Sequence, residues 1–145
     1  MLKNVTFPAE RDLLPQMVSQ FEGEISKYVS NAIWLNRLKL CADEIITNII
    51  DYSGSKNLCF SCEFVESENA LRFEFVDTGT PYNPLENDME VDIDAEPDAR
   101  NIGGLGIFLY TTIMDKIEYR YEGGKNILTA TKFLTEGVEG GCEIK

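Results

Sequence analysis

The feature that most constrains the fold is an unbroken helical period that runs from about Ala32 to Tyr52. Its apolar side chains fall on one side of the predicted helix, at Leu35, Leu38, Ala42, Ile45, Ile46 and Ile49. A helix with a single apolar stripe has to bury that stripe against another layer of structure. A shorter segment from Asp12 to about Val29 shows the same period, and its Pro15 falls in the first turn, where proline is tolerated. The sequence therefore predicts two helices whose apolar faces pack against a second layer of secondary structure.

Predicted strands supply that layer. They fall at about residues 5–7, 58–66, 70–76, 116–121 and 127–134, and a third helix is expected to begin near Gly104. Because the last four strands form two hairpins, we expect a mixed, largely antiparallel sheet. Three helices on one face of such a sheet make an α+β two-layer sandwich, not the parallel framework of a Rossmann or P-loop domain. Residues 1–145 are expected to form a single domain whose tail, 135–145, is frayed.

The composition excludes several classes of site. The chain has no histidine, so it cannot form a Ser-His-Asp or Cys-His catalytic site, a histidine-ligated zinc site or a phosphohistidine relay. Its net charge of −12 disfavours nucleic acid as a partner and favours a basic protein surface.

The sequence shows neither a membrane span nor an export signal. Its apolar runs fall far short of the ~20 residues that cross a bilayer, and its first residues lack the apolar core of a signal peptide. We therefore expect a cytoplasmic protein with no membrane partner, whose cysteines are reduced thiols. Cys41 falls inside the long predicted helix and is not expected to be an activated nucleophile.

A carboxylate and a carboxamide lie one turn apart on the long helix. Glu44 and Asn48 are four residues apart, which places their side chains on one face within ~6 Å of each other. Asn48 could offer a neutral oxygen to Mg²⁺ while Glu44 accepts a proton. Taken alone, this helix fits a solvated polar face better.

An Asp-x-Gly turn follows the second long strand. Asp77 leaves the sheet there and could accept a hydrogen bond from a ligand amino group such as that of adenine, and Gly79 would let the backbone approach the ring closely. The alternative is an ordinary turn of this composition, which is common.

A glycine-rich segment, residues 103–106, opens the predicted third helix. Free amides and the helix dipole at such a start suit phosphate oxygens. The dinucleotide fingerprint and the P-loop motif are both absent from the sequence, so the segment is a weak signal by itself.

Residues 85–102 are predicted to form a lid or binding loop, because irregular segments of this length usually have that role. Acidic residues alternate along it, at Glu86, Asp88, Glu90, Asp92, Asp94, Glu96 and Asp98. Arg100 is its only basic residue and could reach a phosphate, although an unattached surface arginine fits equally well. A calcium loop is disfavoured, since Ile93 and Ala99 stand where an EF-hand needs glycine and glutamate. A solvated acidic loop is the simplest interpretation.

The order and spacing of these segments resemble the GHKL nucleotide-binding superfamily, which has gyrase, heat-shock ATPase, histidine kinase and MutL types. Residues 44–48 resemble its N box, 77–79 its G1 box and 104–106 its G2 box. Over about residues 7–133 the chain is most similar to the RsbW-type anti-sigma-factor serine kinases. The segments that carry this closer likeness are residues 77–85, 103–107, 115–119 and 124–126.

The resemblance implies that the chain binds ATP and Mg²⁺. Asn48 would coordinate the metal, and Asp77 would bind adenine, with Gly79 beneath the ring and Asn126 near it.

The resemblance also implies the chemistry. Gly104, Leu105 and Gly106 would present amides to the phosphates, and Glu44 would be the general base that takes the proton of a substrate serine. Positioning and charge neutralisation supply most of the catalysis in such a transfer.

The implied partners are a sigma factor or similar regulator and an antagonist protein that is phosphorylated on serine, with a homodimer as the usual assembly. One departure is Tyr52-Ser53, where RsbW-type proteins usually have a histidine and histidine kinases have this ending. Two other functions stay open: a nucleotide-sensing module without phosphotransfer, and a structural interaction protein whose glycine-rich turns are ordinary caps.

Overall fold

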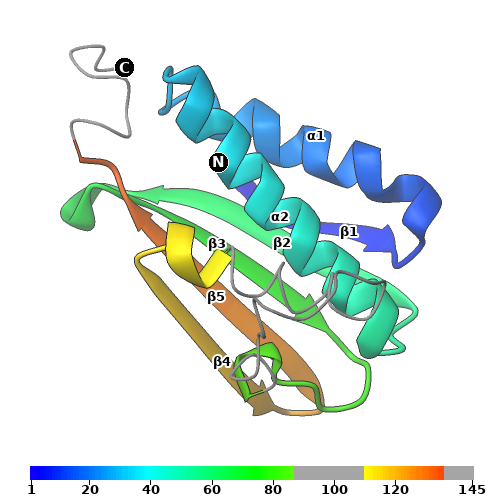
Figure 1. Cartoon of the computed structure of the whole chain (residues 1–145). Coiled ribbons are helices and arrows are strands. Elements are labelled where there is room, and N and C mark those ends of the chain that lie inside the picture. The colour runs from blue at the N-terminus through cyan, green and yellow to red at the C-terminus, as the bar shows by residue number, and fades with distance from the viewer. Residues whose placement is uncertain (87–109, 136–145) are drawn as a thin grey trace, which may run out of the picture.

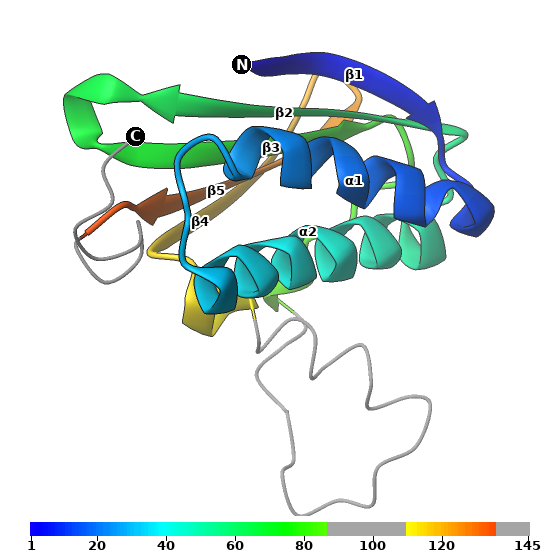
Figure 2. The same ribbon diagram turned by 90° about the horizontal axis from the view of Figure 1, so that it is seen from above.

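Helices cover one face of a twisted five-stranded sheet in the computed structural model, which describes residues 1–86 and 110–135 (Figure 1). The strands are β1 (Leu2–Pro8), β2 (Asn57–Val65), β3 (Ala70–Asp77), β4 (Lys116–Glu122) and β5 (Lys125–Phe133), and the long helices are α1 (Leu14–Ile25) and α2 (Ala32–Tyr52). Figure 2 shows both helices on the same side of the sheet. The predicted α+β two-layer sandwich is confirmed.

The strand order is β1-β2-β3-β5-β4. All four pairings are antiparallel, so the described strands include no parallel pair of the kind that a mixed sheet would contain. Residues 110–113 are helical and lie on the same face as α2. The predicted start of this third helix near Gly104 lies outside the described residues.

The long helix has the predicted bounds because its ends are marked by local chemistry. The Asn31 side chain accepts hydrogen bonds from the backbone N–H groups of Ile33 and Trp34, over 3.0 and 3.1 Å. At the other end the chain leaves the helix at Ser53, and Gly54 follows with a φ of +72°.

The first helix is shorter than its apolar pattern predicts. The pattern continues to Val29, but α1 ends at Ile25, and the backbone N–H groups of Tyr28 and Val29 both bond the Ile25 carbonyl in a turn. Val29 is nevertheless buried, so the spacing predicted its burial correctly and its helical conformation wrongly.

An aromatic cluster joins the two layers. The ring of Phe21 on α1 lies 4.7–5.5 Å from the rings of three phenylalanines on the sheet, namely Phe60, Phe73 and Phe75. All four side chains are almost fully buried. Contacts of this kind fix α1 over β2 and β3.

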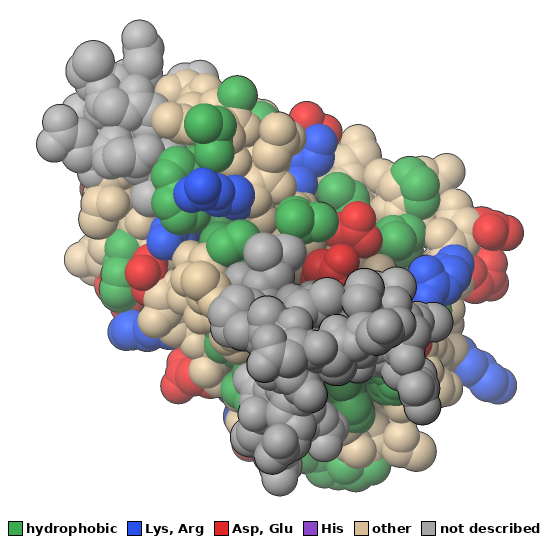
Figure 3. Space-filling view, in the orientation of Figure 1, with side chains coloured by type: hydrophobic (Ala, Val, Ile, Leu, Met, Phe, Trp, Pro, Cys, Tyr) green, Lys and Arg blue, Asp and Glu red, His purple; other side chains and the backbone are tan. Residues whose placement is uncertain are grey.

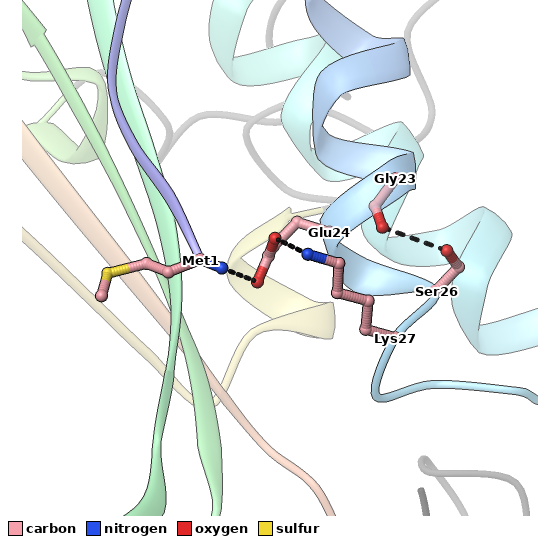
Figure 4. Close-up of polar contacts among 5 residues, drawn as sticks. All are labelled: Met1, Gly23, Glu24, Ser26 and Lys27. Carbon is pink, nitrogen blue, oxygen red and sulfur yellow. Dashed lines mark hydrogen bonds and ion pairs between the residues drawn. The ribbon is translucent and has the colours of Figure 1, made fainter.

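A buried carboxylate ties the start of the chain to the end of α1. Glu24 is 4% exposed, and its two oxygens pair with the Met1 ammonium and the Lys27 ammonium, each over 3.0 Å (Figure 4). A buried carboxylate requires such partners, since it has lost its water.

The last hairpin turns tightly at Gly123 and Gly124, whose φ angles are +60° and +77°. Two residues in this left-handed region match the strand twist, and glycine adopts it without strain. The turn sets the register of β5 and therefore the position of Asn126, which lies opposite Asp77 of β3.

Two thiols are buried between the layers. Burial raises the pKa of the Cys41 thiol to about 12 and raises that of Cys62 as well. Neither thiol is therefore an activated nucleophile, as expected for Cys41. Among the described residues, no helix combines the length and apolar character that a membrane crossing requires.

Candidate functional site

The site is built around a carboxylate at the end of β3. Asp77 is 4% exposed, and its Oδ1 accepts hydrogen bonds from the Gly79 backbone N–H over 2.9 Å and from the Asn126 side-chain amide over 3.0 Å. Within residues 1–86 and 110–135, no hydrogen bond reaches its other oxygen, Oδ2. One oxygen thus anchors the carboxylate, and the second is available to a ligand donor.

Asn126 fastens the loop after β3 to the sheet. Its Nδ2 also donates to the Thr80 carbonyl over 2.8 Å, and its Oδ1 accepts from the Tyr82 backbone N–H over 2.9 Å. The hydroxyl of Tyr119 on β4 donates to the same Oδ1. A buried carboxamide with this many partners has a fixed orientation, so it also fixes Asp77.

Asn48 reaches the same place from α2. Its side chain is buried, and its Nδ2 donates to the Tyr110 hydroxyl over 3.4 Å. Asn48, Asp77 and Asn126 together line one small pocket, whose cavity volume is about 20 Å³. The remaining lining is mostly apolar or aromatic and includes Ile45, Ile49, Phe75, Tyr82, Pro84, Tyr110, Tyr119 and Leu128. A mostly apolar cavity with a few convergent polar groups is typical of a small-molecule site.

Gly79 is required by its packing against the end of α2. A Cβ added to Gly79 would lie 2.1 Å from the backbone oxygen of Ser53. The same oxygen accepts hydrogen bonds from the backbone N–H and the hydroxyl of Thr80, over 2.8 and 3.2 Å. This contact explains the glycine without any ligand, and its predicted place beneath an adenine ring stays a prediction.

Glu44 lies one helical turn before Asn48 but does not line the pocket. Partial burial, and to a smaller extent the neighbouring Asp43 carboxylate, raise the pKa of Glu44 above its usual range. A carboxylate with a raised pKa is a better proton acceptor near neutral pH than an ordinary surface glutamate.

Four predicted site residues lie outside the described residues: Arg100, Gly104, Leu105 and Gly106. The alternating acidic residues from Asp88 to Asp98 lie outside them too. The predictions for the phosphate-binding turn and the lid therefore stay predictions.

The aromatic side chains that line the pocket were not predicted from the sequence. Tyr119 had a usable signal, because the alternation of β4 places it on the same face as Ile117. The sequence gives no such signal for Tyr82, because its position depends on a hydrogen bond from its backbone N–H to Asn126, which is distant in sequence. Tyr82 also stacks on Tyr52 at the end of α2, with ring centroids 5.3 Å apart.

The residues present fit a Mg²⁺ ion that is held mainly by phosphate and water. In the part of the chain that the structure describes, no group of three or more acidic or cysteine side chains could form a protein cage for a metal. Asn48 offers one hard neutral oxygen at the pocket, and Mg²⁺ commonly binds through one or two protein oxygens, substrate phosphates and waters.

Comparison with known proteins identifies the family. The family described as histidine kinase-like ATPase domain matches residues 7–132 of the 145. The chain belongs to the histidine kinase-like ATPase family. Membership of this family, within the GHKL superfamily, confirms the resemblance that the three sequence segments indicated.

Individual relatives of this histidine kinase-like ATPase are consistent with that membership. The serine-protein kinase RsbW of Listeria monocytogenes serovar 1/2a is 29% identical over 131 residues, which cover 84% of this chain and 83% of that protein. The histidine kinase AdeS of Acinetobacter baumannii shares the fold, with a TM-score of 0.53 at 18% identity over 92% of this chain and 70% of that one.

Proposed function

We propose that this chain is an ATP- and Mg²⁺-dependent protein serine kinase that acts as an anti-sigma-type regulatory switch. The observation that carries the proposal is the convergence of Asn48, Asp77 and Asn126 on one pocket, with Glu44 one turn before Asn48 on α2. Similarity to proteins named serine-protein kinase RsbW favours serine as the acceptor.

The adenine end of the nucleotide is read by Asp77. Its Oδ2 accepts the hydrogen bond of the exocyclic amino group, while Oδ1 stays bonded to Gly79 and Asn126. The apolar and aromatic wall of the pocket, which includes Ile49 and Tyr82, covers the faces of the base. Guanine carries an oxygen at the corresponding position and is repelled by the carboxylate.

The chemistry takes place at the other end of the nucleotide. Asn48 supplies an oxygen to the metal, whose charge neutralises the phosphates when it is bound. Glu44 takes the proton of the substrate serine hydroxyl as the serine oxygen bonds to the γ-phosphorus, and the bond to the leaving ADP oxygen breaks. A positioned base contributes about 10²–10⁴-fold to such a step.

The partners follow from charge and from the family. A net charge of −12 suits a basic surface on a sigma factor or similar regulator. The phosphorylated protein is an antagonist that competes for this complex, and two copies of the chain form the working assembly.

The test is phosphate transfer from labelled ATP to the cognate antagonist by the wild-type chain and by Glu44→Gln. We expect phosphoserine with the wild type and a loss of about 100-fold or more in Glu44→Gln. Calorimetric ATP affinity should stay within about twofold, because Glu44 does not line the pocket.

Three outcomes separate the candidate functions. ATP binding without transfer to any antagonist would favour the nucleotide-sensing module. Absence of any thermal shift with ATP and Mg²⁺ would favour a purely structural protein. Undiminished transfer by Glu44→Gln would remove Glu44 as the base while leaving the kinase in place.

A further inference from the structure

An exposed strip of large side chains runs along α2 toward Glu44. Ile33 is 62% exposed and Leu40 is 42% exposed, and Arg37 lies between them on the solvent side. Spacings of four and three residues place these side chains on one face of the helix, and Glu44 continues the series one turn later. Figure 3 shows hydrophobic and basic side chains gathered over the first half of α2. We call Ile33, Arg37 and Leu40 the α2 strip.

Arg37, the cation of the strip, packs on an aromatic ring but has no carboxylate partner among the described residues. The Arg37 guanidinium lies over the ring of Trp34, 4.8 Å from its centroid. Within residues 1–86 and 110–135, Arg37 forms no ion pair with a carboxylate. The other arginines of the described residues, Arg11, Arg72 and Arg120, each pair with a carboxylate.

A second cation on the same ring provides a contrast. Lys132 approaches the Trp34 ring to 4.4 Å, but it is almost buried, bonds the Ile113 carbonyl over 2.9 Å and lies 3.5 Å from the Asp115 carboxylate. Its charge is satisfied within the fold. Arg37 is therefore the cation of this pair that remains available to a partner.

We propose that the α2 strip is the docking surface for the serine-bearing protein substrate, and that it selects a segment with apolar side chains and a carboxylate. This inference rests on the proposed kinase function, because it gives the strip a reason to lead to Glu44. Arginine forms strong, oriented bonds to a carboxylate, and flanking apolar residues exclude water from them.

The geometry of α2 defines the spacing in the substrate. Arg37 and Glu44 are seven positions apart, which corresponds to about 10 Å along the helix axis. An extended segment covers that distance in about three residues. The preferred substrate therefore carries its Asp or Glu about three residues from the serine, with leucine or isoleucine beside the acidic residue.

Trp34 gives a direct readout, because it is the only tryptophan in the chain and lies against Arg37. The probes are two short synthetic peptides that each contain one serine and flanking leucines. One carries glutamate about three residues from the serine, and the other carries lysine there. Each is titrated into the full chain with a non-hydrolysable ATP analogue and Mg²⁺, and the Trp34 fluorescence is recorded.

We expect a saturable change with the acidic peptide and binding that is about tenfold or more weaker for the basic one. Arg37→Glu should reverse this preference. Arg120→Glu is the matched control, because Arg120 is exposed on β4, away from α2, and it should bind the peptides as the wild type does.

The inference is overturned if neither peptide changes the Trp34 signal, if both bind equally well, or if Arg37→Glu keeps the acidic preference. The thermal shift produced by ATP is measured on the same samples. A normal ATP shift with no peptide preference removes only the docking surface, whereas loss of the ATP shift in the wild type removes the proposed function itself.

Discussion

Asp77 and Asn126 face each other across β3 and β5, and the Asn126 amide donates to Asp77 Oδ1 over 3.0 Å. A strand slip of one residue would send one of these side chains to the opposite face of the sheet. The tight turn at Gly123 and Gly124 therefore helps to assemble the pocket as well as the hairpin.

Asp77→Asn should reduce ATP affinity while leaving the fold intact. An asparagine Oδ1 can still accept from Gly79 and Asn126, but an amide then replaces Oδ2 and opposes the adenine amino group. Removal of a charged hydrogen-bond acceptor costs about 1.5–3 kcal/mol, which corresponds to a loss of about 10- to 150-fold in affinity. Isothermal titration calorimetry measures the ATP affinity of both proteins. Glu74→Gln, on the opposite face of β3, is the control, and equal affinities for the two variants would remove the adenine assignment.

Asn126→Ala should destabilise the chain even without a nucleotide. It leaves the Asp77 carboxylate with only one of its two donors, the Thr80 carbonyl without its donor from Asn126, and the Tyr82 backbone N–H without its acceptor. Each buried group left unpaired lowers the free energy of unfolding by about 1–3 kcal/mol, and by less where a water molecule replaces the lost partner. Urea unfolding measures the loss, and Thr129→Ala on the other face of β5 should lose far less. Similar midpoints for the two variants would contradict this role.

Gly79→Ala and Gly23→Ala should have opposite effects on stability. The new Cβ at position 79 would collide with the Ser53 carbonyl, whereas at position 23, within α1, it would meet nothing within 4 Å. Alanine is favoured over glycine in a helix by about 1 kcal/mol. Thermal unfolding of both variants checks the prediction, which fails if Gly79→Ala is as stable as the wild type.

The stability of the wild type relative to Glu44→Gln should fall as the pH rises. Because the pKa of Glu44 is raised in the folded chain, the folded state binds this proton more tightly than the unfolded state does. The associated stability is complete below a pH of about 4 and is lost as the pH rises through the folded pKa. Melting temperatures of both proteins between pH 4 and 7 measure the difference. A flat difference between the wild type and Glu44→Gln over this pH range would contradict the raised pKa.

Local chemistry made much of the fold predictable. The bounds of α2 follow from its apolar stripe and from the Asn31 cap, and both hairpins follow from alternating patterns that end in turn residues. Asp77 was identifiable because it ends a strand. The same reasoning extended α1 too far, since Tyr28 and Val29 are buried in a turn.

Contacts between distant residues were not predictable in the same way. The clash that requires glycine at position 79 comes from Ser53, and the bond that places Tyr82 comes from Asn126. Neither contact leaves a periodic or compositional signal, because each depends on how α2 and β5 meet the loop after β3. The sequence therefore identified the polar residues of the pocket and missed its aromatic wall.

Because the buried Cys41 thiol is protonated in the folded chain, its rate of alkylation reports how often the interior opens. Alkylating reagents attack the thiolate, which a pKa of about 12 keeps scarce while α2 covers the sheet. With Cys59 and Cys142 replaced by serine, two alkylation rates remain to be measured, that of Cys41 on α2 and that of Cys62 on β2. Each rate reports how often the interior opens at that thiol. Comparing the two rates would reveal whether helix and sheet separate together or one at a time.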